Sequence, residues 1–175
     1  MSVKTTVRDA TKAVAKAFGG KSADTAQKDI LDTLKQEHDE VKALLSDLQD
    51  AETAAQRRSL VKQIKAALVP HTKAEEKVVY DAVIALRDKV AQMDGHEGYL
   101  EHQWAAKTLQ RLESIENAAS PEHKAAGKVL KELVEHHIKE EESAVWDDVR
   151  ENFSDADRVR MNAQFEAAKS RVRLN

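Results

Sequence analysis

Six residues of the chain have the types and spacings of a metal-binding site. They are His38, His71, Glu75, His102, His137 and Glu141. Two of the histidines are each followed four residues later by a glutamate, which places both side chains on one face of a helix, where they can contact one ion. The other two histidines each follow a glutamate directly. Because the chain has no cysteine, a metal held here is bound through nitrogen and oxygen atoms.

These residues recur in two copies of one pattern. Residues 71–83 and 137–149 are identical at seven of thirteen aligned positions, among them the histidine and two consecutive glutamates. Residues 37–48 and 101–112 also match, because they share a Glu-His pair and two leucines. The repeat predicts two similar helical hairpins, each of which supplies one histidine from its first helix and a His-x-x-x-Glu pair from its second.

All six side chains lie on the apolar stripes of the expected helices, and this placement needs a cause. An unpaired buried carboxylate costs several kcal/mol, and burying a histidine without partners is also unfavourable. A bound pair of cations resolves both problems. For any single histidine, a core position with a satisfied hydrogen bond is the commoner explanation, so the prediction rests on the set. Two alternatives stay open: a metal-free network of His–Glu hydrogen bonds, and a site that holds zinc.

The remaining histidines are interpreted as lying outside the site. His136 has Glu140 four residues after it, but its stripe carries further acidic residues, whereas the stripe of His137 is apolar and repeats the first hairpin. We therefore place His137 at the site. His96 and His123 fall at expected turns or in first helical turns, where a solvated histidine is the ordinary interpretation.

Neighbouring acidic and aromatic residues are given supporting roles. Glu37 and Glu101 directly precede two of the histidines and point about 100° away from them on a helix, so we expect them to support the site or face solvent rather than bind metal. Tyr80, Trp104 and Trp146 are interpreted as core or helix-packing aromatics.

The elements that position these residues are expected to be helices. The chain has 175 residues, of which 41% are hydrophobic, with only five glycines and two prolines, and this composition favours helix almost throughout. The predicted fold class is all-α, an up-down-up-down four-helix bundle with an N-terminal amphipathic arm and a C-terminal fifth helix. The expected domains are the arm at 1–23, the bundle at 24–151 and a C-terminal helix at 152–175 that packs on the bundle.

Capping and turn residues predict where the helices begin and end. Asp24 is the expected N-cap of the first bundle helix, and Pro70 is expected to kink the second. The Asp94–Gly95 pair predicts a turn before the third helix. Ser120–Pro121 is a good start for the fourth helix, and Ser154 is expected to open the fifth.

Charge and hydropathy limit the partners. The net charge of −3 gives no overall field that would attract nucleic acid, although the first 21 residues are locally basic. No stretch approaches the ~18 apolar residues of a membrane span, and the N-terminus lacks the apolar run of a signal peptide. We therefore expect a cytoplasmic protein that binds neither nucleic acid nor membrane. Homo-oligomerisation through the arm or the fifth helix stays open.

The whole pattern resembles the hemerythrin-like (HHE cation-binding) domain family over residues 27–151. The resemblance implies two non-haem iron ions joined by an oxo or hydroxo bridge, with an open position where dioxygen or another small ligand binds. It also implies that the two histidines of the first hairpin hold one iron, those of the second hairpin hold the other, and the two glutamates bridge them.

The chain departs from the pattern of oxygen-carrying hemerythrins at one ligand. Those proteins use a fifth histidine four residues from another on the third helix, whereas the positions four away from His102 are Gly98 and Ala106. Tyr99 or a water molecule could complete the coordination of the iron held by His102. The expected function is to bind, sense or react with dioxygen or related small oxidants. The alternatives are a di-iron oxidoreductase (peroxidase, oxidase or nitric oxide handling) and iron storage or sensing without oxygen carriage, so enzyme status stays open.

Overall fold

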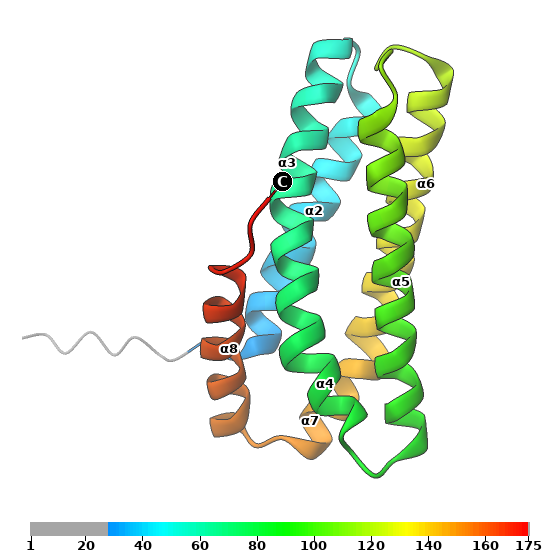
Figure 1. Ribbon diagram of the computed structural model, residues 1–175. Helices are drawn as coiled ribbons and strands as arrows, with labels where there is room; N and C mark the ends of the chain where they lie inside the picture. Colours follow the sequence, from blue (N-terminus) through cyan, green and yellow to red (C-terminus); the bar gives the residue numbers. More distant parts are fainter. Residues whose placement is uncertain (1–27, 175) are drawn as a thin grey trace, which may run out of the picture.

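The computed structural model describes residues 28–174, and the regular structure in this range is entirely helical. Most of it lies in four long helices: α2 (Ile30–Asp50), α3 (Ala54–Glu75), α5 (Lys89–Ser114) and α6 (Pro121–Glu140). Figure 1 shows these helices side by side; α2 packs against α3 and α6, and α5 packs against the same two helices. The predicted all-α class is confirmed for the described residues.

Two of the long helices continue through a wider turn into a short helix. α3 leads into η1 (Glu76–Tyr80) and α4 (Asp81–Ile84), while α6 leads into η2 (Glu141–Val145) and α7 (Trp146–Asn152). At the end of η1 and of η2, a backbone N–H bonds to the carbonyl five residues earlier, instead of four as in an α-helix. α8 (Asp155–Lys169) packs against α2, α3 and η1. Among the helices described, none has the length and apolar character needed for crossing a membrane.

Side-chain caps begin α6 and α8 where the sequence predicts, at Ser120 and Ser154. Thr53, Ser120 and Ser154 each accept a hydrogen bond from the backbone N–H three residues later, which satisfies one of the free donors of the first helical turn. α2 begins directly after Asp29, whose side chain is its N-cap. The predicted cap, Asp24, lies outside the described residues, as does the predicted N-terminal arm.

The predicted turn at Asp94–Gly95 is wrong. Both residues lie inside α5, which begins earlier, with Asp88 as its N-cap. Glycine serves here for close packing, since a Cβ atom at Gly95 would lie only 2.7 Å from Cγ1 of Ile84. The reversal between the two hairpins is made instead by residues 85–88, between α4 and α5. Pro70 lies inside α3, and the helix continues past it to Glu75.

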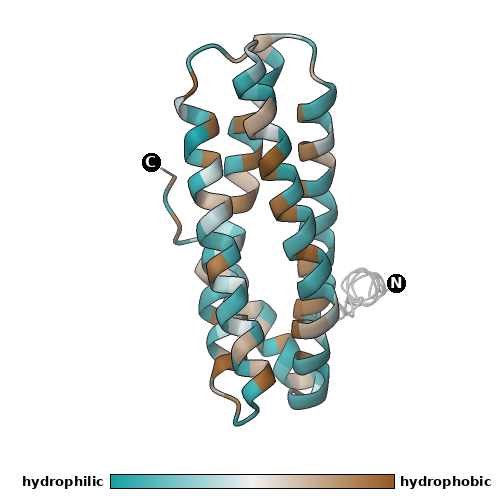
Figure 2. Ribbon diagram, turned by 90° about the vertical axis from the view of Figure 1, so that its right-hand side faces the viewer, coloured by the Kyte–Doolittle hydropathy of each residue, from teal (hydrophilic) through white to brown (hydrophobic). Residues whose placement is uncertain are grey.

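The apolar core consists of two clusters, and the predicted metal ligands lie at the boundary between them. One cluster contains Tyr80 and Val145, and α8 adds Met161 and Phe165 to it. The other contains apolar residues of α2, α3, α5 and α6, such as Leu45. Figure 2 shows apolar residues spaced along helices that are otherwise hydrophilic, as expected where one face of each helix is buried.

A buried arginine joins two connecting segments at one end of the long helices. Arg57 is only 4% exposed, and its guanidinium donates to the carbonyl oxygen of Ala51 from Nε (3.1 Å) and Nη2 (2.7 Å). Its Nη1 donates to the carbonyl oxygen of Ala118, 3.0 Å away. One side chain therefore holds the segment between α2 and α3 against the segment between α5 and α6.

We expect an Arg57→Leu variant to lose about 2–4 kcal/mol of unfolding free energy, because two buried carbonyl oxygens lose charged hydrogen-bond donors. Urea unfolding followed by circular dichroism measures the loss. The matched control is Arg58→Leu, since Arg58 is exposed and should change stability by less than about 0.5 kcal/mol. Equal effects of the two substitutions would contradict this role for Arg57.

Candidate metal centre

The structure brings the six predicted site residues together. Each is at most 7% exposed, and they come from four different helices and the first position of η2. They are His38 of α2, His71 and Glu75 of α3, His102 of α5, His137 of α6 and Glu141 of η2. The spacing of four in each His-x-x-x-Glu pair therefore directs both side chains of a pair to the same interior region.

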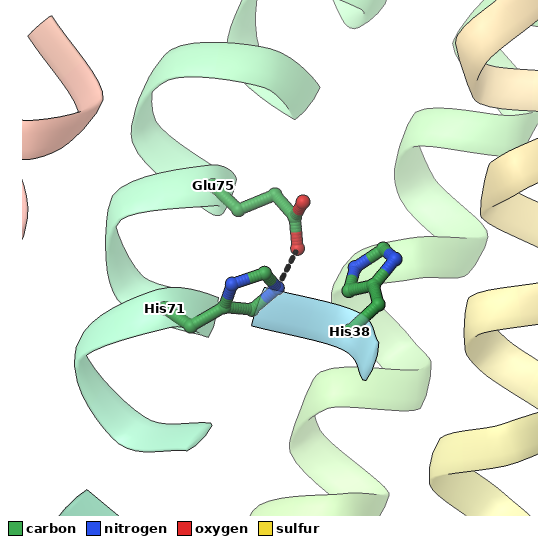
Figure 3. A group of neighbouring side chains, drawn as sticks. All are labelled: His38, His71 and Glu75. Carbon is green, nitrogen blue, oxygen red and sulfur yellow. Dashed lines mark ion pairs between the residues drawn. The ribbon is translucent and has the colours of Figure 1, made fainter. Parts of the chain in front are cut away.

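The donor atoms form two clusters that share one glutamate. The first is His38, His71 and Glu75, and the second is Glu75, His102 and His137; within each, one donor atom per residue lies within 4.8 Å of the others. Figure 3 shows the first cluster, in which His71 Nε2 lies 3.2 Å from Glu75 Oε2. In the second, Nε2 of His102 lies 3.1 Å from Nε2 of His137 and 3.4 Å from Glu75 Oε2. Glu75 thus lies between two potential cation positions.

Glu141, the counterpart of Glu75 in the second hairpin, also lies between the two donor clusters. Its Oε2 lies 3.3 Å from His38 Nε2 and 3.5 Å from His137 Nε2. Neither Glu141 nor Glu75 has a hydrogen-bond partner for either carboxylate oxygen, although all four oxygens are buried. Such groups are costly to bury unless a cation or a proton compensates them. Imidazole nitrogens and carboxylate oxygens facing one another are a donor set that divalent transition metals accept.

A second layer of four glutamates contacts the outer nitrogens of the four histidines. The Nδ1 contacts are His71 with Glu37 (3.0 Å), His38 with Glu142 (3.1 Å), His137 with Glu101 (2.7 Å) and His102 with Glu76 (3.4 Å). A carboxylate at Nδ1 favours the tautomer that carries its proton there, which leaves Nε2 free to bind a metal. Glu37 and Glu101 therefore support site histidines, as expected.

Sequence reasoning did not assign a role to the other two outer glutamates. Glu76 and Glu142 are the second glutamate of each repeated Glu-Glu pair, and this repetition was the available signal. Their partners lie on the opposite hairpin, which spacing within one helix cannot show. Glu76 contacts a histidine of α5, and Glu142 contacts a histidine of α2.

The buried carboxylates attract positive charge. Burial opposes the charged form of His71, but Glu75 and Glu37 outweigh it and raise the pKa of His71 to about 10. Burial, reinforced by Glu75, raises the pKa of Glu141. Burial also raises the pKa of Tyr80, and nearby carboxylates act in the same direction. Protons and metal ions can both supply the missing positive charge, and they compete for the same nitrogen atoms.

The comparison with known proteins agrees with this donor set. The family described as "Hemerythrin HHE cation binding domain" matches residues 29–147, a range that contains all six inner residues and all four outer glutamates. The chain belongs to the hemerythrin HHE cation-binding domain family. The family is described as cation-binding, and the two donor clusters are buried groups of histidine and glutamate that could hold a metal ion.

One curated relative of this hemerythrin-like chain is named "DNA nickase" and comes from Nostoc sp. (strain PCC 7120). The two are 29% identical over 169 residues, which cover 95% of this chain and 47% of the relative. The chain therefore spans about half the length of that protein. No solved structure matches the chain.

The hydroxyl of Tyr99, the predicted candidate additional ligand, is directed away from the donor atoms of the hemerythrin-like centre. It lies 2.9 Å from the backbone oxygen of Glu76 and 2.8 Å from Oδ1 of Asp81. The tyrosine that reaches the centre is Tyr80, which is fully buried and has its hydroxyl 3.4 Å from His137 Nε2. Tyr80 is a core residue, as expected, but the sequence did not indicate this contact.

Two further expectations about individual side chains are wrong. His123 is only 2% exposed, because the first turn of α6 is packed inward beside Arg57 and Arg58, whose charges together with burial lower the pKa of His123. Trp104, expected to be a core or helix-packing aromatic, is 58% exposed. His136 is exposed at the surface, in agreement with its exclusion from the site.

A cavity of about 260 Å³ gives access to the centre. Its lining includes all four inner histidines, together with apolar side chains such as Val134 and Ile138. Glu37 and Lys169, which form an ion pair, also line it. The cavity can therefore admit a small ligand to the histidine side of the centre.

Proposed function

We propose that the protein holds two non-haem iron ions, joined by an oxo or hydroxo bridge, and binds, senses or reacts with dioxygen or a related small oxidant. The observation that carries the proposal is the pair of donor clusters with Glu75 in common, completed by Glu141. In this assignment His38 and His71 hold one iron, the histidines of α5 and α6 hold the other, and the two glutamates bridge. Iron bound there would supply redox and Lewis-acid chemistry to a small ligand.

The chain's own residues would prepare the centre for such a ligand. The outer glutamates hold each imidazole with Nε2 directed inward, so the ligands are oriented before the metal arrives. Apolar side chains such as Val134 and Ile138 form part of the cavity wall beside the histidines, which suits small uncharged molecules such as dioxygen or nitric oxide. The proposed arrangement of α2, α3, α5 and α6 is the up-down-up-down four-helix bundle, which places ligands from facing helices in its core.

Metal loading tests the proposal. Protein supplied with ferrous iron under anaerobic conditions and then exposed to oxygen should contain about two irons per chain and develop near-ultraviolet absorption typical of a bridged ferric pair. A variant carrying His71→Ala and His137→Ala should fold, by circular dichroism, but lack this absorption. Wild-type protein that retains only zinc, or no metal, would refute the assignment. Peroxide turnover above that of the double variant would favour the oxidoreductase alternative.

DNA strand cleavage is a second candidate, favoured by the similarity to the Nostoc relative named "DNA nickase" over most of this chain. That relative is about twice as long, so its named activity can also belong to the part that this chain does not match. The inner donor atoms here are buried, whereas a metal that cleaves a phosphodiester must contact it directly. We therefore expect metal-loaded wild-type protein to nick supercoiled plasmid no faster than the double histidine variant. Faster nicking by wild type would support the second candidate.

A further inference from the structure

The two halves of the centre differ at one repeated position. In the repeat, the aromatic residue five positions after the inner glutamate is Tyr80 in the first hairpin and Trp146 in the second. Trp146 stacks on His38, with ring centroids 5.8 Å apart and planes 14° apart, and its indole nitrogen has no hydrogen-bond partner. An indole N–H cannot bind a metal ion, whereas a phenol oxygen can.

The wider turn of η1 explains how Tyr80 reaches the centre. In a regular α-helix, a residue five positions after Glu75 would point about 140° away from it. The i to i+5 hydrogen bonding of η1 widens the turn, so that the fifth residue comes back toward the face of Glu75. The hydroxyl of Tyr80 then lies 3.5 Å from His102 Nε2 and 3.4 Å from His137 Nε2.

These distances suit a shared metal better than a hydrogen bond. The phenol has one proton, and both nitrogens lie at the outer limit of hydrogen-bond distance from its oxygen. The nitrogens of His102 and His137 are themselves 3.1 Å apart, so the three atoms form a nearly regular triangle. Donors at right angles about a metal ion ~2.1 Å away are about 3 Å apart, so one ion can contact all three.

The backbone of α5 leaves room for the phenol at one position. A Cβ atom at Gly98 would lie 2.6 Å from Cζ and 2.9 Å from the hydroxyl oxygen of Tyr80. Gly98 is four residues before His102, on the same face of α5. A histidine side chain at this position would therefore compete with Tyr80 for the same space.

We propose that the Tyr80 phenolate is a ligand of the metal ion held by His102 and His137. The inference rests on the proposed iron centre and adds an oxygen ligand to one of its two ions. On binding ferric iron, the phenol releases its proton to solvent and its oxygen donates a lone pair to the metal, with no change in oxidation state. The ion held by His38 and His71 has no such ligand, so open coordination is confined to that half of the centre.

The chain contains only two tyrosines, which makes the test specific. Protein loaded with two ferric ions should show a phenolate-to-iron absorption band in the visible region and phenolate ring modes in its resonance Raman spectrum. Tyr80→Phe should lose both signals while keeping two irons. Tyr99→Phe should keep both signals, because the Tyr99 hydroxyl is engaged with Glu76 and Asp81. Ring-deuterated tyrosine in the Tyr99→Phe variant should shift the Raman modes.

A second pair of variants tests the same contact without removing the phenol. Gly98→Ala should weaken or shift the band by displacing the Tyr80 ring. Gly95→Ala should leave the band unchanged, because its Cβ would crowd the side chain of Ile84 and would reach only the backbone oxygen of Tyr80, at an ordinary contact distance of 3.5 Å. Two ferric ions without a phenolate band in wild type, or a band that survives in Tyr80→Phe, would overturn the proposal and leave the iron centre intact. Metal analysis of the same samples that finds no iron in wild type would overturn both.

Discussion

A Glu75→Gln variant should purify with less than one metal ion per chain, compared with the two expected for wild type. Glu75 is completely buried and belongs to both donor clusters, so its loss removes one ligand from each ion at once. The neutral amide also leaves less negative charge to balance two cations between the histidines. Metal analysis after loading, followed by ferrous titration, measures the effect.

The adjacent residue provides the control for this prediction. Glu76 contacts the outer nitrogen of His102 and belongs to neither inner cluster. Glu76→Gln should therefore keep two ions at saturation, with affinity at one of them lowered about 10–100-fold, as is typical when a residue that contacts the outer side of a metal ligand is changed. If Glu75→Gln bound two ions as tightly as wild type, Glu75 would not bridge the centre.

Removal of the metal should destabilise the folded protein strongly. Without cations, four carboxylate oxygens of Glu75 and Glu141 stay buried without hydrogen bonds. Each site saturated at 100 times its Kd contributes about 2.7 kcal/mol, so two sites contribute about 5 kcal/mol. For a chain of this size, the loss corresponds to a fall in Tm of about 10–20 °C. Thermal unfolding of the iron-loaded protein, with and without prior chelation, measures it.

The Glu75→Gln variant separates metal loss from other effects of the chelator. Because that variant should hold little metal, chelation should change its Tm by only a few degrees. A wild-type Tm that is the same before and after complete removal of iron would show that the buried carboxylates are compensated by other means, such as protonated histidines.

The inner donor set could be predicted from sequence because helical geometry and the repeat both constrain it. A histidine and a glutamate four residues apart must share a face of a helix, and the second copy distinguished His137 from His136. Helix starts at Ser120 and Ser154 followed from local capping chemistry, which depends on neighbouring residues alone. These features need no knowledge of how the helices pack.

Features that depend on packing could not be predicted in the same way. Tyr99 lies three residues before His102 and so shares its helical stripe, but its hydroxyl bonds to the neighbouring helical segment. Tyr80 reaches the centre only because of the wider turn in η1, which periodicity based on regular helices does not reveal. Gly95 matched a turn pattern, whereas its actual role is close contact with Ile84.

Neither hairpin contains a complete centre, because each supplies only half of the inner ligands and Glu76 and Glu142 support histidines of the opposite hairpin. Two identical copies of one hairpin, related by a two-fold axis, would bring together an equivalent set of inner ligands and supporting glutamates. Residues 85–88 are then the covalent link that makes one chain of two copies. A symmetric pair must carry two tyrosines or two tryptophans beside its metals. A single chain can carry one of each, so joining the copies is what allows the two metal positions to acquire different chemistry.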